Sequence, residues 1–108
     1  MPALRYVVLH HTGIDSPHYD LMFEQQPHAP LTTFRCAIWP PAPDTIFELL
    51  PDHRPAYLQY EGPISNNRGQ VTRIEAGTCT VESKETDSLQ LSLSSGLKLS
   101  VPAGRITE

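Results

Sequence analysis

Basic residues are few in this chain. Eight lysines and arginines are outnumbered by twelve aspartates and glutamates, which gives a formal net charge of −4 at pH 7. A protein that coats nucleic acid without regard to sequence depends on many contacts from Lys and Arg to phosphates. The composition therefore excludes a large electrostatic surface for nucleic acid and leaves room only for a small basic cluster.

Long apolar runs are also missing. No apolar stretch approaches the roughly 18 residues that a membrane span requires, and the N-terminal residues lack the apolar core of a signal peptide. The two cysteines, Cys36 and Cys79, could pair on count alone, but two isolated cysteines without a secretory context are typical of free, buried thiols. We therefore expect a cytoplasmic protein that does not bind membranes and whose two thiols are free and buried.

Uninterrupted stretches that favour long helices are scarce before residue 64. The chain has eleven prolines, and all of them except Pro102 come before that residue. Proline lacks the N–H that a helix interior requires, and its ring clashes with the preceding turn. This distribution argues against long helices in the first half of the chain.

Short runs rich in β-branched, aromatic and leucine residues lie between these prolines and continue after them. The run 88–96 alternates leucine with polar residues, and its last three residues, SSG, supply a turn. Residues 44–53 fit either a strand or one helical turn, and we expect any helical turn to lie within residues 44–58. The other runs that we expect to form strands are 4–11, 18–24, 31–39, 69–77, 78–83 and 97–107.

Short strands separated by turn signals are typical of antiparallel barrels and sandwiches. At 108 residues the chain is long enough for one modest core. We therefore predict a single all-β domain over residues 1–108, a small closed or partly open antiparallel β-barrel with little helix. The run 4–11 has apolar residues on both faces, so its strand should be covered on both sides.

Residues 18–24 (HYDLMFE) place charged groups in a segment that otherwise fits a buried strand. Side chains alternate along a strand, so the odd-numbered residues of this run form an ordinary apolar stripe. The opposite face carries His18, Asp20 and Glu24. Such a set is costly to bury unless a metal, a phosphate or mutual hydrogen bonds compensate the charges.

Residues 12–17 (TGIDSP) have the composition of a hairpin loop. Such a loop sets His11 beside His18 as a cross-strand pair, and Asp20 follows one step along the same face. Two imidazoles and a carboxylate suit Mn²⁺, Zn²⁺ or Fe²⁺, so we predict a metal site whose ligand atoms lie within about 5 Å of one another. The simpler alternative is that Asp20 only holds His18 in one tautomer.

A second polar stretch covers residues 51–62 (PDHRPAYLQYEG). His53 offers a proton donor or acceptor beside the fixed positive charge of Arg54, and Tyr57 follows four residues after the histidine. Taken alone, a surface loop fixed by proline explains these residues as well. The turn at 65–69 (SNNRG) similarly places Arg68 at a solvated tip.

Taken together and in this order, these stretches resemble the 3′-phosphoesterase domain of DNA ligase D. The resemblance covers about residues 5–78 and rests on VVLHH, HYDLMFE, HRPAYLQYEGPI and RGQV. It implies a compact β-barrel that holds a divalent metal, typically manganese. It also implies removal of a 3′-terminal phosphate, and in some members a 3′ ribonucleoside, from DNA ends before ligation.

The resemblance implies roles for individual residues. His11, His18 and Asp20 match the metal ligands of the family. His53 matches the histidine that faces the scissile phosphate, and Tyr57 matches the tyrosine four residues after it.

The chain departs from the family in the groups that clamp the phosphate. Met22 stands where the family has an arginine, and Pro51 stands where it has a glutamate. The lysine after the family's W-x-x-P segment has no counterpart. Arg54 is therefore the candidate for substrate binding, because a guanidinium pairs well with phosphate.

Three functions remain open. The preferred one is a metal-dependent phosphoesterase that acts on nucleic-acid 3′ ends or on a related small phosphoester, beside a ligase or another repair partner. The second is a non-catalytic barrel that holds a metal and binds nucleic acid or a partner protein. The third, ranked lowest, is a mononuclear iron enzyme in which His18, Asp20 and His53 form a two-histidine, one-carboxylate triad.

Overall fold

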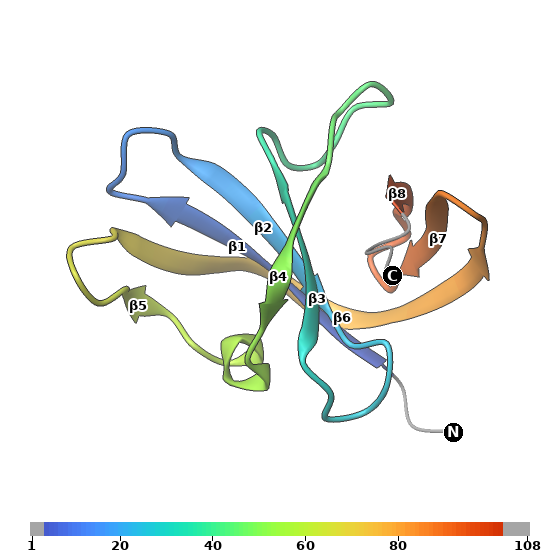
Figure 1. Ribbon diagram of the computed structural model, residues 1–108, viewed down its shortest axis with the longest axis horizontal. Helices are drawn as coiled ribbons and strands as arrows, with labels where there is room; N and C mark the ends of the chain where they lie inside the picture. Colours follow the sequence, from blue (N-terminus) through green and yellow to red (C-terminus); the bar gives the residue numbers. More distant parts are fainter. Residues whose placement is uncertain (1–3, 103–108) are drawn as a thin grey trace.

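The computed structural model describes residues 4–102, whose regular structure is almost entirely antiparallel β-strand (Figure 1). The predicted all-β, barrel-like class is confirmed. Within the described residues one short 3-10 turn, η1 (Pro55–Leu58), occurs, and it lies inside the expected 44–58 segment. The strands are β1 (Leu4–Thr12), β2 (His18–Phe23), β3 (Leu31–Cys36), β4 (Glu48–His53), β5 (Gly62–Pro63), β6 (Gln70–Lys84), β7 (Ser88–Leu93) and β8 (Lys98–Pro102).

The expected strand 31–39 ends at Cys36, where the chain bends ahead of Pro40 and Pro41. Two further details differ from the expected strands. The ambiguous segment 44–53 contributes strand β4. The runs 69–77 and 78–83 form one continuous strand, β6, which Gly77 does not interrupt. A Cβ atom at Gly77 would lie 2.3 Å from Ser94 Oγ, so the glycine allows the Ser94 side chain to approach the strand closely. Residues 103–107 of the last expected run lie outside the described residues.

Seven strands form one curled sheet in the order β4-β3-β2-β1-β6-β7-β8, and β5 pairs with the start of β6. The 15-residue strand β6 pairs with β1 along its first part and with β7 along its second part. Figure 1 shows how this long strand carries the chain from the β1–β4 wall to the β7–β8 wall. The result is a half-barrel with β4 and β8 at its two ends, the partly open form of the predicted barrel.

Both faces of β1 are buried, as predicted. Tyr6 and Val8 lie in the larger apolar cluster, which fills the space between β2, β3 and the β7–β8 wall. Val7 and Leu9 lie in a smaller cluster on the other face, which Leu58 of η1 helps to cover. The metal-ligand candidates lie on the same face as this smaller cluster. Asp20 pairs with Leu9, and the pair of His11 and His18 is the next one along that face.

No helix within residues 4–102 has the length and apolar character needed to cross a bilayer. Both cysteines are free and buried, as expected. Burial raises the pKa of the Cys36 and Cys79 thiols to about 11, so both stay protonated and poorly nucleophilic at neutral pH.

The buried carboxylate of Glu24 is stabilised by Arg5. Its Oε1 accepts hydrogen bonds from the Arg5 backbone N–H at 2.8 Å and from Arg5 Nε at 3.2 Å. Its Oε2 accepts from Arg5 Nη2 at 2.8 Å and from the His28 backbone N–H at 3.0 Å. These bonds, above all those from the Arg5 side chain, lower the pKa of Glu24 to about 2.

We expect Glu24→Gln to destabilise the protein by about 2 kcal/mol at pH 7, because it removes charge-assisted hydrogen bonds from a buried group. A carboxyl group whose pKa is lowered by folding stabilises the native state above its unfolded pKa and loses this contribution as the pH falls. The wild type should therefore lose stability between the ordinary pKa of 4.5 and about 2, and Glu24→Gln should show a weaker dependence over that range.

Urea unfolding at a series of pH values measures this effect. Glu85→Gln, at an exposed position, is the matched control and should follow the wild-type curve. Equal pH dependence in the wild type and Glu24→Gln would contradict the assigned role of the Arg5–Glu24 pair.

Candidate metal centre

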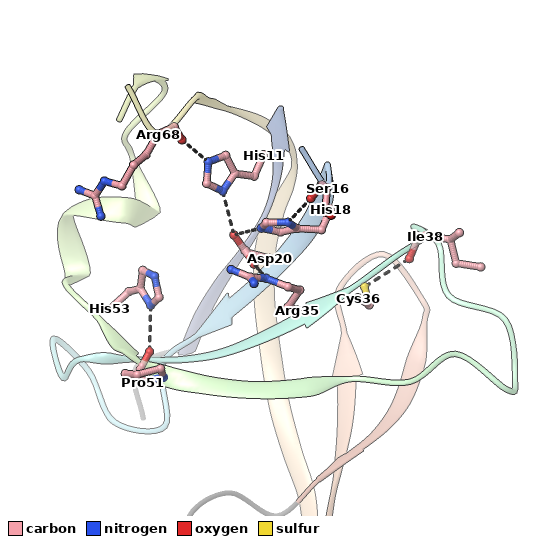
Figure 2. A network of polar contacts seen from close by, with 10 residues as sticks. All are labelled: His11, Ser16, His18, Asp20, Arg35, Cys36, Ile38, Pro51, His53 and Arg68. Carbon is pink, nitrogen blue, oxygen red and sulfur yellow. Dashed lines mark hydrogen bonds and ion pairs between the residues drawn. The ribbon is translucent and has the colours of Figure 1, made fainter. Parts of the chain in front are cut away.

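His11, His18 and Asp20 converge on one face of the β1–β2 hairpin (Figure 2). The strand register pairs His11 with His18 directly, as predicted from the loop between them. His18 Nε2 lies 3.4 Å from Asp20 Oδ2, and His11 Nδ1 lies 4.0 Å from the same oxygen. The ligand atoms of the three residues all lie within 4.8 Å of one another, which agrees with the predicted spacing.

Each imidazole is oriented by a backbone carbonyl group. His18 Nδ1 lies 2.9 Å from the carbonyl oxygen of Ser16, and His11 Nε2 lies 2.7 Å from that of Arg68. A carbonyl oxygen only accepts hydrogen bonds, so these two nitrogens carry the protons. In the neutral ring, the form that binds a metal, the other nitrogen presents a lone pair, and this nitrogen of each ring faces Asp20 Oδ2 (Figure 2).

Two atoms of this cluster are buried without compensation. His18 Nε2 and Asp20 Oδ1 have no hydrogen-bond partner among the described residues, and the two residues are 7% and 4% exposed. An unpartnered buried polar atom typically costs about 1–3 kcal/mol. A cation bound between the imidazoles and Asp20 Oδ2 would remove the penalty of His18 Nε2, whereas Asp20 Oδ1 has only a long ion-pair contact, 3.7 Å, with Arg35 Nε.

The donor set fits a divalent metal. Two neutral imidazoles and one carboxylate are compatible with Mn²⁺, Zn²⁺ or Fe²⁺. Bonds of about 2.1 Å in tetrahedral geometry place donor atoms about 3.4 Å apart. His18 Nε2 and Asp20 Oδ2 already have this 3.4 Å separation, and His11 has to move closer by about 1 Å.

Two glycines allow the Arg68 carbonyl group to reach His11. Gly69 has φ +78°, and a Cβ atom there would lie 2.1 Å from the carbonyl oxygen of Thr12. Gly13 has φ +76°, and its Cβ would lie 3.1 Å from the Cα atom of Gly69. The loop after β1 and the turn before β6 therefore touch at positions that favour glycine. Arg68 is exposed, as expected, but no sequence pattern indicates that its backbone orients a ligand.

His53 ends β4 and faces the same side of the sheet as the cluster. Its register partner on β3 is Leu31, which shares its face with Arg35, the partner of Asp20. Figure 2 shows the His53 ring on the side of the cluster toward which Arg35 extends. His53 Nδ1 lies 3.0 Å from the Pro51 carbonyl oxygen, so Nε2 is the nitrogen left for a ligand.

Arg54 and Tyr57 line a pocket beside the groove of the metal centre. The groove has a volume of about 940 Å³ and is lined by His11, His18, Arg35 and the loop 13–17, among others. The neighbouring pocket has a volume of about 290 Å³, and Arg68 lines both spaces. Tyr57 also meets the ring of His53 edge-on, with 5.5 Å between the ring centroids. The structure thus places Arg54 next to the groove and not within it.

Arg35 is a residue of the site that the sequence analysis missed. It is the register partner of Asp20, and its Nε lies 3.7 Å from Asp20 Oδ1. The sequence feature that could have indicated Arg35 is that it is the one charged residue in the expected strand 31–39. That signal is insufficient by itself, because the register between β2 and β3 depends on the irregular loop 24–30.

Comparison with known proteins does not assign this chain to a family. No model of a protein family matches it, and no curated protein matches it significantly. The resemblance to the 3′-phosphoesterase domain therefore remains a hypothesis based on the motif residues.

We expect Gly69→Ala to weaken metal binding by about tenfold or more, in the range seen when groups that orient metal ligands are lost. A Cβ atom there overlaps the Thr12 carbonyl oxygen and forces apart the two loops that hold His11. Titration of the metal-free protein with Mn²⁺, followed by calorimetry, measures the change.

Gly96→Ala is the matched control. Gly96 also has a positive φ, +101°, but a Cβ atom there meets nothing within 4 Å, and its turn lies between β7 and β8. Both variants strain the backbone, whereas only Gly69→Ala should change the metal affinity. An unchanged affinity in Gly69→Ala would contradict the orienting role of the Arg68 carbonyl group.

Proposed function

We propose that this protein is a cytoplasmic, metal-dependent phosphoesterase that hydrolyses phosphoesters at the 3′ ends of nucleic acids. The observation that carries the proposal is the cluster of His11, His18 and Asp20, whose lone pairs face one point. The motifs HYDLMFE and HRPAY, which resemble those of the 3′-phosphoesterase domain, favour this reaction over others that use the same donor set. The same resemblance makes manganese the expected ion.

The retained residues suit hydrolysis of a phosphate monoester. A divalent ion, when bound, supplies a Lewis acid that stabilises negative charge on a phosphoryl oxygen. Protonated His53 donates its Nε2 proton to the leaving 3′ oxygen while its Nδ1–H stays bonded to the Pro51 carbonyl oxygen. Water adds to phosphorus and the bond from phosphorus to the 3′ oxygen breaks. The products are a 3′-hydroxyl end and inorganic phosphate.

The pocket beside the groove suits the nucleotide next to the reacting phosphate. Arg54 and Arg68 supply positive charge for a backbone phosphate, and Tyr57 and Tyr60 supply aromatic rings on which a base can stack. Only a few contacts are needed at a strand end, which agrees with the low content of basic residues. A ligase that requires a 3′-hydroxyl end is the expected partner.

A non-catalytic metal-holding module is the second candidate. Its support is that Met22, at the position of the family's arginine, is 2% exposed and packs in the smaller apolar cluster. The iron triad has less support, because His11 and not His53 stands with His18 and Asp20 in the described part of the chain.

We expect His53→Ala to lower the turnover of a 3′-phosphorylated oligonucleotide by about 100-fold or more, the usual contribution of a general acid. Its metal content should stay unchanged, because His53 is outside the ligand cluster. His18→Ala should lose both metal and activity. Phosphate release in Mn²⁺ and metal analysis of each purified variant provide the two measurements.

His10→Ala is the matched control for these substitutions. His10 lies on the opposite face of β1, where it stacks on Tyr19 with 4.4 Å between the ring centroids. Its removal should leave metal content and turnover close to the wild type. A wild-type protein that is loaded with Mn²⁺ but inert on 3′-phosphate and 3′-ribonucleotide ends would favour the non-catalytic module.

A further inference from the structure

Arg35 projects from β3 onto the face that carries the metal centre. Its register partner is Asp20, and partners on antiparallel strands share a face. Figure 2 shows its guanidinium extending past Asp20 toward the side on which His53 stands. The side chain is 40% exposed and lines the groove together with His11 and His18.

The contact between Arg35 and Asp20 differs from the structural ion pair between Arg5 and Glu24. The two arginines have almost the same side-chain exposure, 40% and 42%. Arg5 binds Glu24 through a fork of side-chain hydrogen bonds of 2.8 and 3.2 Å. The shortest ion-pair contact of Arg35 with Asp20 is 3.7 Å, beyond hydrogen-bond distance. Arg35 is therefore attracted to Asp20 without being held by it.

The guanidinium of Arg35 has donors to spare. Within residues 4–102 its Nε is buried without a hydrogen-bond partner. Glu48, its register partner on β4, is exposed and forms no ion pair with it in this part of the chain. That N–H lies toward Asp20 Oδ1, whereas the terminal nitrogens of the 40% exposed side chain donate no hydrogen bond within the described residues. An acceptor that enters the groove can therefore bind to them.

The charge of the loaded centre favours an anion as this acceptor. A divalent metal, Asp20 and Arg35 give a net charge of about +2 around neutral imidazoles. Asp15, Glu48 and Arg68 also line the groove and lower the total to about +1. A phosphoryl group brings negative charge and several acceptor oxygens in the spacing that a guanidinium fork matches.

We propose that Arg35 is the anion-binding residue of this centre and that it holds a tetrahedral phosphoryl group beside the metal. The proposal rests on the metal centre of the proposed function and adds a residue to it. The family's arginine would stand on β2, where this chain has the buried Met22, and Arg35 would bind the phosphate from the adjacent strand β3 instead. The ligand class is a phosphate monoester or its product, inorganic phosphate.

Calorimetric binding of inorganic phosphate to the Mn²⁺-loaded protein tests this role. Arg35→Gln should weaken phosphate binding by about tenfold or more, while the affinity for Mn²⁺ changes by less than about threefold. Arg35→Lys should retain part of the phosphate affinity, because it keeps the charge but loses the fork. Lys98→Gln removes the same charge from an exposed position on β8 and should bind phosphate like the wild type.

Three results would overturn the proposal. The first is that the Mn²⁺-loaded wild type does not bind phosphate. The second is that Arg35→Gln binds phosphate as tightly as the wild type. The third is that Arg35→Gln loses affinity for Mn²⁺ and for phosphate to the same extent. The last result would mean that Arg35 only positions Asp20. Hydrolysis of 3′-phosphate ends, measured in parallel, keeps the two proposals separate. A loaded protein that binds phosphate through Arg35 without hydrolysing the ends supports the anion site and contradicts the enzyme.

Discussion

Two backbone hydrogen bonds determine what the histidine cluster can do. The carbonyl oxygens of Ser16 and Arg68 accept from one nitrogen of each imidazole, which leaves the opposite nitrogen as a lone pair facing Asp20. If either ring carried its proton on the other nitrogen, an N–H would point at the position that a metal needs. The hairpin register and the close contact of Gly13 with Gly69 matter for the site because they fix these carbonyl groups.

The two carboxylates on the polar face of residues 18–24 meet different environments. Glu24 has hydrogen bonds from Arg5 and His28, and the low pKa of its carboxyl group reflects a satisfied buried charge. Asp20 is also buried, but its Oδ1 lacks a hydrogen-bond partner among the described residues. The first arrangement stabilises the fold, whereas the second leaves unsatisfied polarity where a ligand can bind.

Local sequence patterns were sufficient for the all-β class and for the convergence of His11, His18 and Asp20. Both depend on alternation and on one short hairpin loop, which neighbouring residues encode. The place of Arg35 was not predictable, because it depends on the register across a longer loop. The role of the Arg68 carbonyl group was also hidden, since any residue has a carbonyl group and the contact joins segments 57 residues apart. Arg54 is next to His53 in the sequence, but it lines the neighbouring pocket and not the groove.

We infer that His11, His18 and Asp20 bind one divalent metal through atoms that the fold has already oriented. A crystal structure of the Mn²⁺-soaked protein, with anomalous scattering recorded at the manganese edge, would locate the ion and its ligand atoms. We expect one strong peak within bonding distance of His11 Nδ1, His18 Nε2 and Asp20 Oδ2. A fully occupied Mn²⁺ site elsewhere with no peak at the three residues would contradict this inference. Coordination through the opposite imidazole nitrogens would contradict it as well.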